Sequence, residues 1–501
     1  MHRFPSAEAE IAAELTDVRP GLVPGYTREL PRARAAVLTR LWRGLVYEPL
    51  PWIARREPVG GELALLLTDG RRLRGPRADP YATGAYVTEV WLGGTAYGDP
   101  VRLMTDLAVP HSAAFAAELG HSVASLALSR AERRIHPQEW PGRDWEWEQR
   151  VVDGHPFHPN CRARPGFSVA EQLAYGPEHG SLVELGLVPV PAGECLVTGV
   201  WPEWLREAGR VVIPVHPWQA AHVLKRTGER RVAAHPLMAL RTLALPDGPH
   251  VKTALSARLT SSVRDISLGS VAASAVLSDF GEAVAARTDG LLHITRTLGA
   301  AAAGSPDLAA VLRESPEEYV RTGERVVPVA ALATTELAHS QAWLSRFARL
   351  ALTVGLRLLE LGVALEAHGQ NLLVVLSPDG DPVRLVYRDL ADLRVGPARL
   401  ARHGIPLPEL PERMVTDDER TLRRKLFGSL VAGALAGTAG SGPVLRTVVE
   451  SAVRDLARTP DLRALRDEPL PAKALTLMRL SPRTAGDQWA ELPNPLHDDL
   501  L

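Results

Sequence analysis

The sequence predicts an α+β fold with mixed antiparallel sheets and a largely helical C-terminal region. Three observations predict this fold class. Residues 1–130 combine helical apolar spacing with a few alternating, strand-like runs. Residues 131–330 hold short strand-like runs between proline and glycine turns, and residues 331–501 are mainly helical around one hairpin. We therefore expect three domains with these boundaries.

The individual elements follow from the same patterns. Apolar residues return at helical spacing in AEAEIAAELTD (7–17), HSAAFAAELGHSVASLALSRAERR (111–134), AHSQAWLSRFARLALTVGLRLLELG (338–362), DDERTLRRKLFGSLVAGALAG (417–437), VLRTVVESAVRDLAR (444–458) and AKALTLMRL (472–480). Strands are expected in YATGAYVTEVWLGGTAYG (81–98), RVVIPVHPW (210–218), HVKTALSARLTSS (250–262) and GLLHITRTLG (290–299).

Composition excludes several classes of protein. The net charge is −1, from 57 basic and 58 acidic residues, which argues against a bulk nucleic-acid binder or a polybasic membrane protein. The two cysteines, Cys161 and Cys195, are too few for a disulfide framework and fit a reducing compartment. No signal-peptide pattern opens the chain, and the apolar window 426–440 is shorter than the roughly 20 residues of a membrane span. We expect a cytoplasmic protein without nucleic-acid or membrane partners, in which this window is a buried helix.

Lysine is rare in this chain. It occurs only at Lys225, Lys252, Lys425 and Lys473, and every other basic residue is arginine or histidine. Where a positive charge alone suffices, arginine has taken the position. A remaining lysine therefore suggests a place that needs an ammonium group.

The most informative segment is a predicted hairpin. The apolar runs LLVVL (372–376) and VRLVYR (383–388) flank the turn-forming sequence SPDGDP. Antiparallel partners mirror each other about the turn, so Asn371 should lie across from Arg388 or Asp389. The polar residues expected to converge at the open end are Glu366, His368, Gln370, Asn371, Arg388 and Asp389.

Asn371 and Asp389 together suit a magnesium ion. Mg²⁺ prefers oxygen ligands, and protein kinases hold Mg²⁺ beside nucleotide phosphates with an Asn and an Asp arranged in this way. The alternative is a polar hairpin end stabilised by ordinary Asn and Asp capping.

A second candidate site is the loop GHPFHPNCRARPGF (154–167). Its prolines and glycines fix the loop, so that His155, His158, Arg162 and Arg164 can face a phosphate or a carboxylate. His-x-x-His without a suitably spaced cysteine, on a proline-broken loop, is a poor zinc pattern. The alternative is a buried pair of histidines that bind only the protein.

Two further segments carry polar groups. His216 in VHPWQ (215–219) can contact substrate or simply pack. In KTALSARLTSSVRD (252–265), Lys252 leads into Ser261, Ser262 and Arg264, and hydroxyls beside an arginine at a strand end make a small anion cradle, or an ordinary turn. No P-loop, no G-x-S-x-G turn and no convincing cysteine nucleophile occurs. The pattern favours binding of a nucleotide and an anionic substrate without a covalent enzyme intermediate.

Five motifs together resemble the IucA/IucC-like, NRPS-independent siderophore synthetases. The motifs GHPFHPNCRARPGF, VHPWQ, KTALSARLTSSVRD, EAHGQN and VYRDL occur in that family's order and at its intervals. The resemblance extends from about residue 90 to the C-terminus. It implies a cupped-hand fold with a thumb (1–130), fingers (131–330) and a palm (331–501).

The resemblance also implies an activity. Such an enzyme adenylates a carboxylic acid, usually citrate or a related di- or tricarboxylate, with ATP and Mg²⁺. An amine, hydroxylamine or alcohol then attacks the acyl adenylate, and AMP and pyrophosphate are released. Homodimers are common in the family.

By motif match, the resemblance assigns roles to individual residues. It implies catalytic roles for His155, Arg264 and His368. The expected ATP contacts are His155, Arg162, Ser261, Ser262, Arg264, Glu366, His368, Gln370, Asn371 and Asp389. The expected metal ligands are Glu366, Asn371 and Asp389, and the expected substrate contacts are His158, Arg164, His216, Lys252 and Arg388.

Three positions depart from the family pattern. Arg162 stands where the family usually has lysine, and Asp265 stands where it commonly has threonine. The stretch SLGSVAASAVLSDF (267–280) lacks a basic residue that the family usually has there. Two alternatives to the ligase therefore stay open: a small-molecule phosphotransferase that uses Asn371 and Asp389 on Mg²⁺, and a non-catalytic binder of an anionic ligand.

Overall fold

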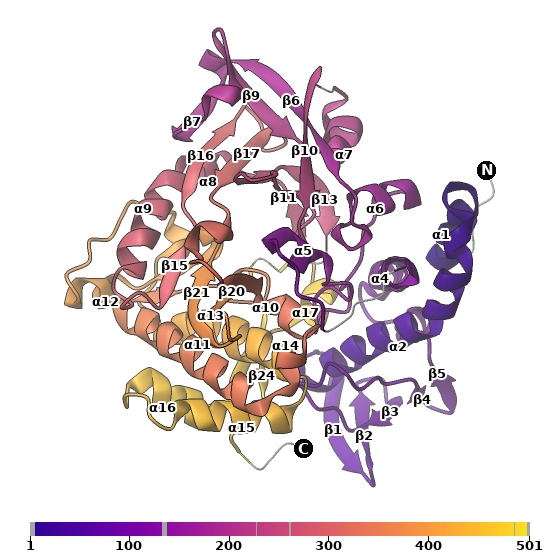
Figure 1. Cartoon of the computed structure of the whole chain (residues 1–501). Coiled ribbons are helices and arrows are strands. Elements are labelled where there is room, and N and C mark those ends of the chain that lie inside the picture. Colours follow the sequence, from indigo (N-terminus) through magenta and orange to yellow (C-terminus); the bar gives the residue numbers. More distant parts are fainter. Residues whose placement is uncertain (1–5, 133–137, 227, 260–261, 485, 498–501) are drawn as a thin grey trace.

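A computed structural model describes residues 6–132, 138–226, 228–259, 262–484 and 486–497. Figure 1 shows three regions that follow the sequence: helices and a small sheet at the N-terminal end, a long sheet from the middle of the chain, and a helical C-terminal part around a second sheet. The short helix α5 (Asp144–Gln149) lies in the middle, between the long sheet and the C-terminal part.

Helices and a five-stranded antiparallel sheet form the N-terminal region. Ser6 begins the first helix, because its side-chain oxygen accepts a hydrogen bond from the Ala9 N–H. Leu15, Leu38 and Trp42 are fully buried among the helices. The elements are α1 (Ala7–Val18), α2 (Val23–Tyr47), β1 (Ile53–Val59), β2 (Glu62–Leu67), β3 (Arg72–Pro76), β4 (Val90–Leu92), β5 (Thr95–Tyr97), α3 (Pro100–Leu107) and α4 (Ser112–Glu132).

The middle of the chain forms a nine-stranded antiparallel sheet, in the order β7-β16-β17-β12-β11-β10-β6-β9-β8. Its strands are β6 (Val183–Pro191), β7 (Leu196–Gly199), β8 (Arg206–Glu207), β9 (Arg210–Val215), β10 (Arg230–Pro236), β11 (Thr242–Ala244), β12 (His250–Thr253), β16 (Thr297–Ala302) and β17 (Ala309–Arg313). The ribbon of β13 (Leu255–Leu259) and β14 (Ser262–Arg264) follows β12. Short helices accompany these strands: α6 (Val169–Tyr175), α7 (Pro217–Gln219), α8 (Leu268–Ala272) and α9 (Ser274–Ala285).

The C-terminal part contains a four-stranded sheet in the order β15-β21-β20-β18, in which β15 runs parallel to β21. Its strands are β15 (Leu292–Ile294), β18 (Arg325–Pro328), β20 (Leu372–Leu376) and β21 (Pro382–Tyr387), and two short pairs accompany it: β19 (Val363–Ala364) with β22 (Arg394–Val395), and β23 (Leu470–Lys473) with β24 (Trp489–Leu492). The helices are α10 (Val329–Leu332), α11 (Gln341–Leu361), α12 (Pro397–Arg402), α13 (Glu419–Ser429), α14 (Ala436–Ala439), α15 (Gly442–Val453), α16 (Pro460–Asp467) and α17 (Leu475–Leu480), and a π-helical turn, η10 (Leu430–Leu435), joins α13 to α14.

Most predicted elements are confirmed. Helices α1, α4, α11 and α15 and the hairpin β20–β21 lie where the patterns place them. The apolar window 426–440 is a largely buried helix, and no helix in the described part of the chain is both long enough and apolar enough to cross a bilayer.

The strand expected at 250–262 divides at Ala254, because β12 joins the long sheet while β13 pairs with β14. Strands β15 and β18, from before residue 331, pair with the hairpin, and the domain boundaries at 130 and 330 stay predictions.

A buried carboxylate connects the N-terminal region to the C-terminal segment. Glu48, at the end of α2, accepts hydrogen bonds from the backbone N–H groups of Thr476 and Leu477 at 3.0 and 2.7 Å. Burial raises the pKa of Glu48, against the effect of these hydrogen bonds. The first turn of α17 is thus fixed against α2, and the residues on either side of it are held in place.

We expect Glu48→Ala to lower the free energy of unfolding by about 2–4 kcal/mol, because two buried N–H donors lose a charged acceptor. The matched control is Glu62→Ala, at an exposed strand position, which should change it by less than about 0.5 kcal/mol. Urea denaturation followed by circular dichroism measures both. Equal stability of the two variants would show that this connection contributes nothing.

Candidate functional site

The hairpin brings Asn371 and Arg388 together as the sequence predicts. Leu372 pairs with Tyr387, and one residue further the Arg388 N–H donates to the Asn371 carbonyl at 3.0 Å. Asp389, the next residue, adopts φ = 78°, a left-handed conformation that is uncommon outside glycine. Such a conformation persists only where the surroundings enforce it, and it concentrates at functional sites.

Basic residues from the long sheet surround Asp389. Lys252 donates from Nζ to Asp389 Oδ2 at 2.6 Å, and Arg313 Nη2 lies 3.6 Å from Oδ1. Although burial opposes it, the charges of Lys252, Arg313 and Arg241 hold the pKa of Asp389 far below its usual range. The ion pair with Lys252 joins the end of the hairpin to strand β12.

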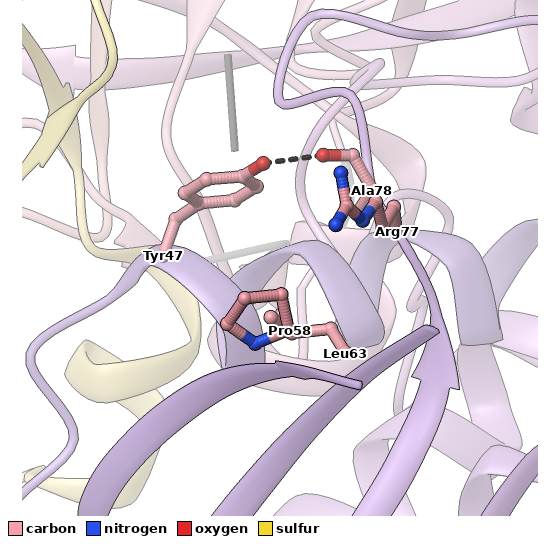
Figure 2. Close-up of a pocket in the computed structure, with 5 residues that line it drawn as sticks. All are labelled: Tyr47, Pro58, Leu63, Arg77 and Ala78. Atoms are coloured by element: carbon pink, nitrogen blue, oxygen red, sulfur yellow. Dashed lines mark hydrogen bonds between the residues drawn. The ribbon is translucent and has the colours of Figure 1, made fainter. Parts of the chain in front are cut away.

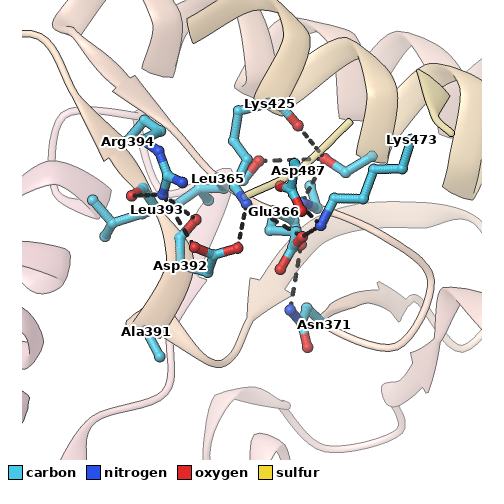
Figure 3. Close-up of polar contacts among 12 residues, drawn as sticks. Leu365, Glu366, Asn371, Ala391, Asp392, Leu393, Arg394, Lys425, Lys473 and Asp487 are labelled. Atoms are coloured by element: carbon cyan, nitrogen blue, oxygen red, sulfur yellow. Dashed lines mark hydrogen bonds and ion pairs between the residues drawn. The ribbon is translucent and has the colours of Figure 1, made fainter. Parts of the chain in front are cut away.

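A second cluster of charges surrounds Glu366 (Figure 3). Its Oε1 lies 2.7 Å from Lys473 Nζ and 3.2 Å from Lys425 Nζ. Lys473 also pairs with Asp487 at 3.2 Å, and Lys425 pairs with Asp392. Burial raises the pKa of Glu366, but the two lysines outweigh it and lower the pKa to about 2. Glu366 is therefore ionised and doubly paired.

Three of the four lysines in the chain thus pair with carboxylates at this site. Lys252 pairs with Asp389, while Lys425 and Lys473 pair with Glu366. The fourth, Lys225, is exposed and donates to the Ala221 carbonyl at 3.1 Å. The expectation that lysine remains where an ammonium is needed holds at these three positions.

Three histidines share one hydrogen-bonding arrangement. The Nδ1 atoms of His155, His158 and His368 each accept backbone N–H donors, from Phe157 and His158, from Asn160, and from Gln370 respectively, at 2.9–3.2 Å. These bonds assign the neutral tautomer that carries its proton on Nε2. Burial lowers the pKa of all three, to about 3 for His158. Each ring therefore offers a neutral N–H donor in a fixed direction.

These histidines lie near one another and near Arg264. The rings of His155 and His158 are 6.0 Å apart, and after burial and His158, His368 is among the groups that lower the pKa of His155. After burial, the charge of Arg264 is among the causes that lower the pKa of His158. Burial also lowers the pKa of Arg264, while Asp389 and Glu366 raise it. Arg264 is thus within electrostatic reach of both carboxylate clusters, while the predicted site roles of these residues stay predictions.

Several predicted contacts are bonded to the protein itself. Arg162 donates from Nε to the Val152 carbonyl at 2.6 Å and also to that of Val151. Arg164 pairs with the buried Glu178 at 2.8 Å. The guanidinium groups of both arginines therefore support the loop at 154–167, and their predicted ligand contacts receive no support.

Arg388 and His216 also have structural partners. Arg388 pairs with the buried Glu148 and donates from Nε to the Gln370 carbonyl at 3.0 Å, so it braces the hairpin against α5. His216 is fully buried, accepts the Trp218 N–H at Nδ1 and packs edge-on against Tyr175. Ser261 lies outside the described residues, and only the backbone of Ser262 is described.

The predicted metal ligands do not fit a magnesium ion in this arrangement. Glu366 and Asp389 are both paired with lysine ammonium groups, which repel a cation, and the Asn371 amide donates to the Glu366 carbonyl at 3.3 Å. Within the described residues, no group of three or more His, Cys, Asp or Glu is placed to hold a metal. Since these side chains neutralise each other, Mg²⁺ would depend mainly on oxygens brought by a bound substrate.

Sequence reasoning missed four basic residues of the site. Lys425 and Lys473 were notable for their rarity but were given no role, and nothing in the sequence distinguishes Arg241 and Arg313 from the many other arginines. Their places become visible only once distant strands and helices come together.

The described pockets lie away from these clusters. One small pocket is lined by Tyr47, Pro58, Leu63, Arg77 and Ala78, where the Tyr47 hydroxyl donates to the Ala78 carbonyl (Figure 2). Another is formed by residues near Trp52, His111 and Leu477. Neither contains a residue of the charged clusters, so the candidate site rests on the contacts of its side chains.

Solved structures share this fold. The petrobactin biosynthesis protein AsbB from Bacillus anthracis matches with a TM-score of 0.78 and 19% identity, over 96% of this chain and 98% of that one. ATP-bound aerobactin synthetase IucA from Klebsiella pneumoniae matches with a TM-score of 0.66 and 17% identity, over 93% and 99%. The chain therefore has the α+β, cupped-hand fold of these siderophore-biosynthesis proteins.

Sequence comparisons agree with the fold. Residues 144–334 match the IucA / IucC family, and residues 341–487 match a second family, described as ferric iron reductase FhuF-like transporter. The resemblance to this family that was read from the motifs is therefore confirmed.

Two curated relatives show the range of similarity. The citryl-spermidine/3,4-dihydroxybenzoyl-citryl-spermidine:spermidine ligase of Bacillus anthracis is 26% identical over 49% of this chain and 50% of its own length. The 2-[(L-alanin-3-ylcarbamoyl)methyl]-3-(2-aminoethylcarbamoyl)-2-hydroxypropanoate synthase of Staphylococcus aureus is 23% identical over 62% of this chain and 63% of its own length. The chain thus spans between half and two thirds of these relatives.

The low pKa of Glu366 gives a pH prediction. Because this pKa falls from 4.5 to about 2 on folding, its ion pairs stabilise the protein above about pH 4.5, and this stabilisation is lost as the pH falls towards 2. We expect wild type to exceed Glu366→Gln in unfolding free energy by about 3 kcal/mol near neutral pH. The difference should shrink as the pH falls from about 5 to 2.5.

Urea denaturation at several pH values measures this difference. Glu10→Gln, at an exposed position, is the control and should stay within about 0.5 kcal/mol of wild type throughout. A wild-type advantage over Glu366→Gln that does not vary with pH would contradict the ionised, doubly paired state.

Proposed function

We propose that the chain is an ATP-dependent ligase of siderophore biosynthesis. It adenylates citrate or a related di- or tricarboxylate, joins it to an amine, hydroxylamine or alcohol, and releases AMP and pyrophosphate. The observation that carries the proposal is the convergence of three neutral histidine donors with Arg264 and two lysine-paired carboxylates. The names of the relatives, which include citrate ligases and siderophore synthases, support it.

The basic groups would reduce the electrostatic repulsion between the two anionic substrates of this reaction. A triphosphate and a di- or tricarboxylate repel each other, and cations around the reacting atoms offset that repulsion. Arg264 would stabilise charge on the α-phosphate as the acid oxygen attacks it, and the fixed Nε2–H groups of His155 and His368 would orient phosphate oxygens. Pyrophosphate leaves in this first step. The nucleophile then attacks the acyl carbon and AMP departs.

Magnesium is not assigned to protein ligands in this proposal. The lysine partners of Glu366 and Asp389 would have to move before either carboxylate could bind a cation. Where Mg²⁺ accompanies the nucleotide, it supplies charge neutralisation at the phosphates. We also propose a cytoplasmic homodimer, as the family resemblance implies.

Neither alternative is favoured. A phosphotransferase that uses Asn371 and Asp389 on Mg²⁺ needs a free Asp389 carboxylate, whereas Lys252 holds it at 2.6 Å. A non-catalytic binder was suggested by Asp265 and by the missing basic residue after it. Asp265, however, is exposed, and Lys252 and Arg313 bring positive charge to the same region.

We expect the protein to form a hydroxamate from citrate and hydroxylamine, with AMP as the nucleotide product. His368→Ala and Arg264→Ala should each lower the rate by roughly 100-fold or more, since each removes a donor aimed at developing charge. The control is His222→Ala, an exposed histidine paired with Glu171, which should retain full activity. ADP as the product would indicate the phosphotransferase, and near-normal turnover in either site variant would contradict the site assignment.

The neutral state of the histidines gives a second prediction. Because burial holds the pKa of His155 well below 6.5 and lowers that of His158 to about 3, the charge of these two rings should not change between about pH 8 and 6. ATP affinity, measured by calorimetry and corrected for protonation of the phosphate, should be flat over this range. If ATP affinity instead rose as the pH fell, with a midpoint near 6.5, and if this rise were absent in His155→Asn, an imidazolium would form at this position.

A further inference from the structure

Three basic residues of the long sheet surround the single carboxylate of Asp389. Lys252 on β12 and Arg313 on β17 lie on one face of the sheet as diagonal neighbours, because Lys252 pairs with Val311 and His250 pairs with Arg313. Arg241 immediately precedes β11, in which Thr242 pairs with Lys252. All three cations influence the pKa of Asp389.

These cations are not balanced by the protein. Arg313 is only 7% exposed, yet within the described residues its guanidinium has one partner, Asp389, at an ion-pair distance of 3.6 Å and without a hydrogen bond. Burial lowers the pKa of Lys252, and Arg241 and Arg313 lower it further, against the attraction of Asp389. Because burial lowers the pKa of Lys252 to about 7, one carboxylate faces two guanidinium groups and a partly protonated amine, and positive charge is still in excess. Burying such an excess is costly unless an anion shares the site.

The other charged groups nearby are already paired or lie outside. Arg388 is held by Glu148, Glu366 is held by two lysines, and the side chain of Asp265 is exposed. Arg264 adds a further positive charge close to Arg241. Of these groups, only Asp265 opposes the positive charge, since it raises the pKa of Arg241, but it does so less than Asp389 does.

The backbone around Arg241 is built to hold this residue. Leu240 adopts φ = 62°, a conformation that is an outlier for a bulky residue. The Arg241 carbonyl accepts two hydrogen bonds from Thr253, from the N–H at 2.8 Å and from Oγ1 at 3.1 Å. Its Nη1 donates to the carbonyls of Arg264 and Asp265 at 2.9 and 2.8 Å. Arg241 therefore fixes the end of β14 while its charge faces Asp389.

We propose that Arg241, Lys252 and Arg313 form an oxyanion subsite in which Asp389 serves as the internal counter-ion. The excess of positive charge matches an anionic group. Phosphate oxygens of a nucleotide and carboxylates of an organic acid share this chemistry, and either can fill the subsite. The identity of the ligand rests on the proposed function, whereas the existence of the subsite rests on the uncompensated charge.

Binding measurements with simple anions test the subsite. Pyrophosphate and citrate are titrated separately into the full chain by isothermal calorimetry, with EDTA present to remove metal. Arg313→Met should weaken the binding of one of them by roughly tenfold or more, because a charged hydrogen-bond donor is lost. Arg313→Lys should restore part of that affinity. Arg296→Met, beside β16 with a half-exposed side chain paired to Glu314, is the matched control and should bind as wild type does.

The anion whose binding is weakened in Arg313→Met shows whether the subsite takes a phosphate or a carboxylate. Loss of pyrophosphate binding assigns the subsite to phosphate, and loss of citrate binding assigns it to a carboxylate. If neither titration changes in an Arg313→Met protein that unfolds at the wild-type temperature, the subsite does not exist.

Asp389→Asn separates the counter-ion role from that of a metal ligand. Asparagine has the same shape and tolerates a left-handed backbone, so the fold should be retained. A counter-ion competes with the incoming anion, so its removal should tighten metal-free anion binding several-fold. If Asp389 were only a metal ligand, Asp389→Asn would leave metal-free anion binding unchanged. Unchanged or weaker binding would therefore overturn the counter-ion role.

The subsite and the proposed function can fail independently. A wild-type protein that forms no hydroxamate but binds pyrophosphate or citrate in an Arg313-dependent way would keep the subsite and discard the ligase. A protein that forms hydroxamate at full rate as Arg313→Met would keep the ligase and discard the subsite.

Discussion

The ion pair between Lys252 and Asp389 is the contact on which the site depends. It joins β12 of the nine-stranded sheet to the residue that ends the hairpin strand β21, across 137 positions of sequence. Asp389 holds a left-handed backbone that few residues other than glycine adopt, and the partners of its carboxylate help to enforce it. Arg313 on β17 adds a longer ion pair to the same carboxylate at 3.6 Å, so both links between the two sheets end on Asp389. The neighbouring pair of Arg388 with Glu148 braces the same junction through α5.

Charge balance explains why the site has two different halves. Around Glu366, two lysines and Arg394 face three carboxylates, because Asp392 and Asp487 join the cluster, so this half is close to neutral. Around Asp389, one carboxylate faces three cations. A polyanion is therefore attracted to the second half. Under the proposed function, this difference would direct the organic anion and the nucleotide phosphates to the Asp389 side of the site.

Local features of the site could be predicted from the sequence, whereas its charge partners could not. The hairpin register placed Asn371 opposite Arg388 because pairing in a tight hairpin follows from the turn alone. The protein partners of Arg162 and Arg388 could not be predicted, since whether an arginine faces a ligand, a backbone carbonyl or a buried glutamate depends on which segment packs beside it. The place of Arg241 and Arg313 at the site could not be predicted from the sequence for the same reason. The rarity of lysine was the one compositional clue to contacts between distant segments, and it singled out Lys252, Lys425 and Lys473.

The histidines complete this electrostatic arrangement without adding charge. A further positive charge near Arg264 and Lys252 would raise the cost of burying the cations still more before any ligand arrived. A neutral imidazole whose Nδ1 is held by backbone N–H groups avoids that cost and still presents a donor at Nε2. The Nε2 atom of His158 is buried and has no hydrogen-bond partner within the described residues, an unsatisfied state that a bound oxyanion would relieve. The cations would therefore attract an oxyanion, while the fixed neutral donors would orient it.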